Sequence, residues 1–123
     1  MTIHSYKELI VWQKAMDLVV SIYRLTGGFP KDELYSLTNQ MRRAAVSIPS
    51  NIAEGRCRST RKDFLQFLRI ANGSGSELET QLEIAKRLSF GDKSEYNKIE
   101  QQLSEVMRML NSMITKLNPT LSR

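Results

Sequence analysis

Apolar side chains recur every three or four residues through four consecutive segments of this chain, which is the spacing of one face of an α-helix. No segment shows the alternation of a β-strand, and there is no tandem repeat. The last segment is the most regular, because two sets of apolar residues each repeat every seven positions: Tyr96, Leu103, Leu110 and Leu117, and Ile99, Val106 and Met113. The pattern predicts an all-α fold, an antiparallel up-down-up-down four-helix bundle.

Glycines, prolines and capping residues separate the four segments. Ser5 with Glu8 forms a capping box, Pro49 is expected to bend the second helix, and Gly55 is expected to close it. Thr60 with Asp63 resembles another N-terminal cap. The expected helices run from about 6 to the glycines at 27 and 28, from about 33 to 54, from after 60 to about 88, and from after 92 to 118.

Residues 72–76, with the sequence NGSGS, could be a loop or part of a helix. Two glycines in a helix interior each cost about 1 kcal/mol, which favours a loop. The apolar spacing favours a helix, because Ala71, Gly75, Leu78 and Leu82 continue the stripe of the preceding residues without a slip. We therefore expect one continuous helix, whose glycines let a neighbouring helix approach closely.

Length and composition are those of one soluble domain. With 123 residues and 41% hydrophobic content, the chain can bury a single core, and we expect one domain over 1–123 with short flexible tails at about 1–5 and 118–123. No apolar run is long enough to cross a membrane, and the first residues lack a secretory signal pattern. A single cysteine, Cys57, fits a reducing compartment, so we expect a cytoplasmic protein.

A second, polar stripe runs beside the apolar stripe in the second helix. Its members are spaced by three or four residues: Gln40, Arg43, Ser47, Asn51 and Glu54. The third segment carries a possible mate, since Ser74, Glu77 and Gln81 interrupt an apolar flank. We hypothesise a structural polar seam between the two helices, in which Arg43 pairs with Glu77. The alternatives are a solvated surface and a binding surface.

Positive charge is concentrated after the second helix. The net charge of +5 lies wholly in the first 62 residues, which carry ten Lys/Arg and five Asp/Glu, whereas the remainder carries eight of each. The predicted nucleic-acid-binding residues are Arg56, Arg58, Arg61 and Lys62, with Arg42 as an outlying member. The alternative is that these side chains only complement the dipole of a helix C-terminus.

The sequence gives little support for catalysis. Its only histidine, His4, lies in the expected tail, and its only cysteine is Cys57, so neither a catalytic triad nor a His/Cys metal site can be assembled in one subunit. The glycines at 73 and 75 lack the strand and the lysine of a phosphate-binding loop. We expect no enzyme activity, metal or cofactor.

Four stretches together resemble the bacterial four-helix-bundle proteins associated with 23S rRNA intervening sequences: Leu9–Tyr23, Phe29–Leu37, Gln40–Gly55 and Phe67–Leu82. The motif QMRRAAVSIPSNIAEG is the most specific of them. The resemblance implies an antiparallel bundle that assembles into a ring, typically a homopentamer, with no enzymatic activity. It also implies a nucleic-acid context, since some members are encoded inside rRNA genes and distant relatives engage a reverse transcriptase.

These observations favour a homo-oligomeric scaffold that associates with RNA or DNA, or with an RNA–protein complex, through a basic edge. The rival is an adaptor that binds a partner protein in a helix groove, with the charge only aiding solubility. Neither hypothesis involves a membrane.

Overall fold

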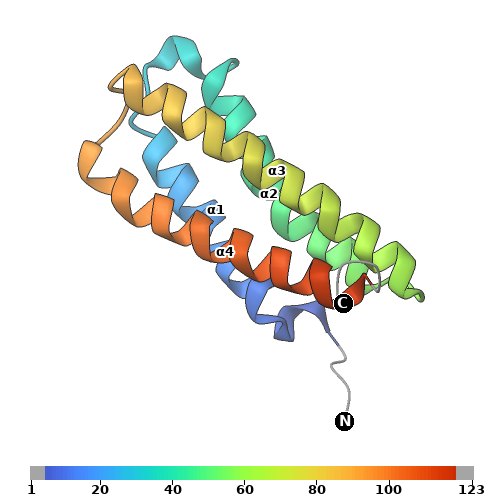
Figure 1. Ribbon diagram of the computed structural model, residues 1–123. Coiled ribbons are helices and arrows are strands. Elements are labelled where there is room, and N and C mark those ends of the chain that lie inside the picture. Colours follow the sequence, from blue (N-terminus) through green and yellow to red (C-terminus); the bar gives the residue numbers. More distant parts are fainter. Residues whose placement is uncertain (1–4, 119–123) are drawn as a thin grey trace.

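The computed structural model describes residues 5–118, which form four long helices and three short 3-10 turns. The helices are α1 (Ile10–Thr26), α2 (Leu37–Arg56), α3 (Arg61–Arg87) and α4 (Tyr96–Leu117), and the turns are η1 (Tyr6–Glu8), η2 (Lys31–Glu33) and η3 (Lys93–Glu95). Helix α1 packs against α2 and α4, and α3 packs against the same two helices, so α1 and α3 lie diagonally across the bundle (Figure 1). The predicted all-α up-down-up-down bundle is confirmed.

The core consists of the predicted apolar stripes. In α4 the heptad positions Tyr96, Leu103 and Leu110 are buried, while Met113 and Leu117 are only partly covered. One end of the bundle holds the start of α1, the turn 57–60 between α2 and α3, and the end of α4, and we call it the turn end (Figure 1). The expected tails fall outside the described residues except for Ser5 and Asn118.

Two helices begin later than the sequence indicates. Ser5 Oγ accepts a hydrogen bond from the Lys7 N–H at 3.1 Å, but it caps η1, and α1 begins only at Ile10. Similarly, α2 begins at Leu37 instead of Glu33, because the residues after Pro30 form η2. Glu33 Oε1 accepts a hydrogen bond from the Leu37 N–H at 3.3 Å, so a residue expected inside the helix partners its first backbone donor.

Gly55 does not close α2, which corrects the expectation from its helix-ending preference. It lies inside the helix and is buried, and α2 continues to Arg56. A Cβ atom at this position would lie 2.6 Å from the Phe67 Cβ of α3. The glycine is there because α3 passes too close for a side chain.

The continuous helix expected through 72–76 is confirmed, since α3 runs without interruption from Arg61 to Arg87. Thr60 caps it as expected, with its Oγ1 accepting a hydrogen bond from the Asp63 N–H at 3.1 Å. Gly75 is buried where a Cβ would collide with Met107 of α4. Gly73 is exposed, and a Cβ there would meet no atom within 4 Å. Close helix approach therefore explains only one of these two glycines.

Candidate nucleic-acid interface

Part of the predicted polar seam forms between α2 and α3. Ser47 Oγ and Ser74 Oγ lie 2.8 Å apart, and the Asn51 amide donates to Ser47 Oγ at 2.9 Å and to the Ser47 carbonyl oxygen at 2.8 Å. All three side chains are half-buried. Only the Ser47–Ser74 bond links the two helices, at a level where small side chains allow the close approach, and the Asn51 bonds lie within α2.

The predicted pair of Arg43 and Glu77 does not form: among residues 5–118 neither side chain has a partner within ion-pair distance. Both are exposed and line a shared open recess of about 420 Å³, together with Ser47 and Ser74. A direct ion pair between the two side chains would add little stability here, because the recess is open to solvent. The remaining predicted members lie apart from this bonded group.

Glu54 and Gln81 have other environments. Glu54 Oε2 forms an ion pair with Arg58 Nη2 at 2.8 Å, one helical turn away. Gln81 is 5% exposed, and its Oε1 has no hydrogen-bond partner among the described residues. Gln40 is exposed at the edge of the recess. The seam is therefore three residues long and not eight.

The predicted basic turn has cations of two kinds. Arg58 is engaged, because its guanidinium pairs with Glu54 and lies 5.1 Å from the centre of the Phe67 ring. Arg61 and Lys62, in the first turn of α3, are exposed and form no ion pair within the described range. Arg56 is half-buried at the last residue of α2. Exposed cations that form no ion pair are those most available to a phosphate group.

Arg42 does not belong to this cluster, which corrects its placement as an outlying member. Its Nε donates a hydrogen bond to Thr26 Oγ1 at 2.8 Å, and its guanidinium lies 4.5 Å from the centre of the Tyr23 ring. Both partners are in the last turn of α1, at the opposite end of the bundle. This arginine joins α1 to α2, because its Nε–H is bonded to Thr26 and its guanidinium is stacked on Tyr23.

The fold brings further exposed cations to the half of the bundle around the turn end, and the sequence reasoning missed them. Lys7 of η1 is one, and three come from the second half of the sequence: Arg69 of α3, and Arg108 and Lys116 of α4. Residues 63–123 have no net charge, so counting charge along the chain concealed these three. For Arg69 the helical phase held a signal, because it follows Lys62 by seven residues and so lies two turns further on the same side.

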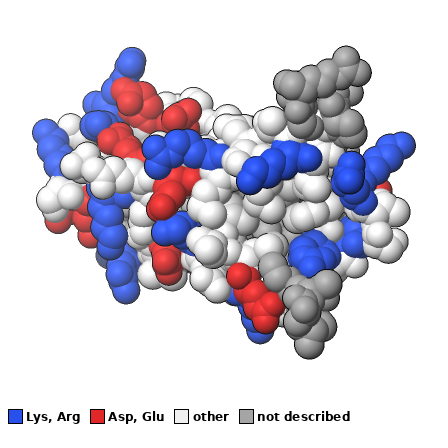
Figure 2. All heavy atoms as spheres, turned by 60° about the horizontal axis from the view of Figure 1, so that its bottom comes forward, with Lys and Arg blue, Asp and Glu red and all other residues white. Residues whose placement is uncertain are grey.

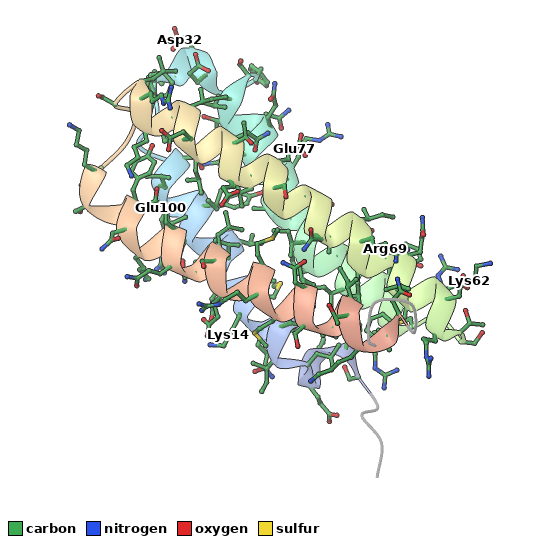
Figure 3. All side chains as sticks on the ribbon, viewed as in Figure 1. Lys14, Asp32, Lys62, Arg69, Glu77 and Glu100 are labelled. Carbon is green, nitrogen blue, oxygen red and sulfur yellow. The ribbon has the colours of Figure 1, made fainter. Side chains whose placement is uncertain are left out.

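The acidic residues of the second half lie mainly towards the opposite end, in the last three turns of α3, in η3 and at the start of α4: Glu79, Glu83, Asp92, Glu95 and Glu100. Figure 2 shows this separation on one face, with red and blue mixed on the left and mostly blue on the right, where the turn end lies. In Figure 3, Lys62 and Arg69 lie near the turn end, and Glu77 lies further along α3. Positive potential is thus concentrated at one end.

Two titrating groups have shifted pKa values, and both lie away from the turn end. Burial, and the nearby Glu100 carboxylate, raise the pKa of Tyr96 to about 12. Hydrogen bonds from the Ser94 backbone and hydroxyl lower the pKa of Asp92 below its usual value. Both groups lie in the connection between α3 and α4, where their hydrogen bonds stabilise the chain reversal. They take no part in the turn end, which is at the other end of the bundle.

Residues 5–118 contain no group of three or more His, Cys, Asp or Glu side chains placed to hold a metal ion. None of their helices is long and apolar enough to span a bilayer. His4 lies outside the described residues.

The exposed cations at the turn end can attract and bind anions.

A family model for the 23S rRNA-intervening sequence proteins matches residues 7–112. The chain belongs to this family. Its fold is also similar to the crystal structure of a protein of unknown function from the S23 ribosomal protein family of Bacteroides thetaiotaomicron, with a TM-score of 0.76 and 27% sequence identity. That similarity covers 85% of this chain and 98% of the other. No curated protein matches this sequence.

Proposed function

We propose that this family member is a non-enzymatic, homo-oligomeric scaffold of the cytoplasm that associates with RNA, or with an RNA–protein complex, through its turn end. The observation that carries the proposal is the group of exposed cations there. Arg61, Lys62 and Arg69 form no ion pair among the described residues, while most acidic side chains lie elsewhere.

Binding of this kind depends on charge and not on base sequence. Each phosphate that a Lys or Arg neutralises releases condensed counterions, so affinity falls steeply with added salt. A single copy offers few such contacts, and assembly multiplies them. A pentamer would carry a net charge of +25, five times the +5 of one chain, and could engage several phosphates of one strand simultaneously.

Two separate exposed apolar surfaces support self-association. The first, the α1/α2 surface, consists of Met16, Val20, Tyr23 and Val46. The second, the α3 surface, consists of Ile84 and Leu88, one turn apart, and of Ile70, which the exposed Glu77 separates from them. Surfaces of this type usually mark contacts with another molecule. Because the two surfaces differ, a head-to-tail contact between copies fits them, and such contacts generate a ring where the rotation between copies closes.

A protein-interaction adaptor is the second candidate, and an apolar groove favours it. A groove of about 620 Å³ lies between the start of α1 and the end of α4, and Ile10, Met109 and Met113 contribute to its lining. A partner helix could lay its apolar face there. Arg108 and Lys116 border the same groove together with Glu8 and Glu105, so its charges balance and its apolar lining would carry the contact.

A salt titration of RNA binding separates the two candidates. The test variant replaces Arg56, Arg58, Arg61 and Lys62 with Gln. The control replaces four exposed cations of the opposite end, Arg24, Lys31, Lys93 and Lys98, with Gln, so that both variants lose the same charge. We expect the test variant to bind a generic RNA at least tenfold more weakly and with a smaller salt dependence than the control. Equal binding by both variants, or salt-insensitive binding by the wild type, would refute the proposal.

A further inference from the structure

The outermost side of α3 carries an unbroken row of polar and positive residues that starts at the turn. We call it the α3 ridge, and its members follow each other at intervals of three or four residues: Lys62, Gln66, Arg69, Gly73, Ser76 and Thr80. All six are exposed. This spacing places them on one line along the helix, facing away from the core.

The chemistry of the α3 ridge is that of a hydrogen-bond donor to anions. It offers an ammonium, an amide, a guanidinium and a serine hydroxyl. None of its six members is a carboxylate, but two exposed carboxylates border it: Asp63 follows Lys62, and Glu77 follows Ser76 one turn after Gly73. The Thr80 hydroxyl donates to the Ser76 carbonyl oxygen at 3.1 Å, so the row of available donors ends at Ser76. From Lys62 to Ser76 the helix rises about 21 Å, long enough for several phosphates of one strand.

Gly73 provides an independent observation. A glycine inside a helix costs about 1 kcal/mol relative to alanine, and Gly55 and Gly75 offset this cost by letting a neighbouring helix approach. Gly73 has no such role, because a Cβ there would meet nothing within 4 Å. Its effect is to leave bare backbone between Arg69 and Ser76, where another molecule can come close.

Charge decides which molecule fits. A second copy placing its own α3 ridge there would bring like charges together, and an apolar partner would find no apolar side chain within the row. A polyanion gains from both cations and from the donors between them. The uncovered backbone at Gly73 then gives room for a sugar ring beside a bound phosphate.

We propose that the α3 ridge binds the sugar–phosphate backbone of a single nucleic-acid strand, which runs from the basic turn along α3 to Ser76. This inference rests on the proposed function and adds a path for the ligand. It also assigns a role to Gln66, Gly73 and Ser76, which the turn alone does not require.

The test compares two variants of equal charge. Arg69→Gln with Ser76→Glu changes the α3 ridge beyond the turn, and Lys98→Gln with Ser104→Glu makes the same chemical changes at exposed positions of α4. Binding to a uridine 20-mer and to a thymidine 20-mer is measured by fluorescence anisotropy at several salt concentrations, with helicity checked by circular dichroism. The ridge variant should bind both strands at least tenfold more weakly than the control, with a salt slope smaller by about one.

A third variant tests the approach at Gly73 without changing charge. Gly73→Gln fills the bare backbone site, and we expect it to weaken binding severalfold while the protein stays folded. If the ridge variant binds like its control while the turn variant loses binding, the strand contacts only the turn and the path along α3 is wrong. If the wild type binds neither strand, the proposed function fails as well.

Discussion

The glycines inside the long helices differ in what surrounds them. Gly55 faces Phe67 and Gly75 faces Met107, so each is a point where two helices touch. Gly73 faces open space. The same residue type therefore has opposite consequences for stability at positions only a few turns apart.

Substituting alanine at two of these positions measures the difference. Gly55→Ala places a methyl group 2.6 Å from the Phe67 Cβ, and such overpacking typically costs about 1–3 kcal/mol. Gly73→Ala adds a methyl group in open space and should stabilise the protein by up to about 1 kcal/mol through helix propensity. Urea unfolding of both variants gives the two free energies, and changes of equal sign would contradict this assignment.

Ionisation of the Tyr96 hydroxyl should lower the stability of the folded protein at high pH. This hydroxyl donates a hydrogen bond to the Phe90 carbonyl oxygen at 2.8 Å, and burial raises its pKa to about 12, above its ordinary value of 10.0. A raised pKa means that the folded state favours the neutral phenol, so this stabilisation is complete below pH 10 and disappears as the pH rises to 12. Tyr96→Phe should be less stable at pH 8 and should lose less stability between pH 10 and 12, as measured by chemical unfolding at each pH.

At the scale of elements, the pairing of α2 with α3 organises the bundle. Their contact includes Gly55 at one level and the bonded Ser47, Asn51 and Ser74 at another. Small side chains bring the backbones close, and the hydrogen bonds fix the register between the helices. The recess with Arg43 and Glu77 lies at the solvent side of this contact.

Double-mutant cycles should distinguish these two pairs. Ser47→Ala and Ser74→Ala remove two ends of one 2.8 Å hydrogen bond, so their combined effect should differ from the sum by about 0.5–1.5 kcal/mol. Arg43→Ala and Glu77→Ala should be additive within about 0.5 kcal/mol, since no ion pair joins them in the described range. Coupling at Arg43 and Glu77, with none at the serines, would mean that the register of α2 against α3 differs from this structure.

Helix number, order and core faces could be predicted from the sequence, because each depends on local periodicity. Most helix ends could be predicted as well, but the starts of α1 and α2 and the end of α2 could not. Gly55, for example, has the local features of a terminator but is fixed by Phe67 in another helix. Only part of the candidate site could be predicted from the sequence, because some of its residues are neighbours in the chain and others are placed by contacts between helices. Arg61 and Lys62 are neighbours in the chain, whereas Arg42 is turned towards Tyr23 and Arg69 reaches the turn end only through the course of α3.

At the scale of the whole molecule, charge and apolar surface have different positions. The basic residues concentrate at the turn end, whereas the α1/α2 surface and the α3 surface run along the sides. In a ring built through its sides, every copy can keep its turn end exposed. Assembly and nucleic-acid binding at the turn are therefore compatible, and assembly should raise the affinity for a strand by avidity. Along α3, Ile70 and Ile84 adjoin members of the α3 ridge, so a subunit contact and a strand there would occupy neighbouring positions.

The head-to-tail geometry can be tested with two complementary variants. Val20→Asp places a charge in the α1/α2 surface and Ile84→Asp places one in the α3 surface, while Gln101→Asp on the polar side of α4 is the control. Each of the first two should reduce the assembly to monomers of 14.1 kDa, measured by light scattering, and should weaken RNA binding in parallel.

Mixing the two variants separates a head-to-tail contact from a symmetric one. A Val20→Asp copy retains an intact α3 surface, and an Ile84→Asp copy retains an intact α1/α2 surface. These two intact surfaces can form one contact between the copies. The other surface of each copy carries the substitution, so no third copy can bind. The mixture should therefore give a dimer of twice 14.1 kDa, although each variant alone is monomeric. A contact that used the same surface on both copies would leave the mixture monomeric, and a wild type of 14.1 kDa would exclude the ring.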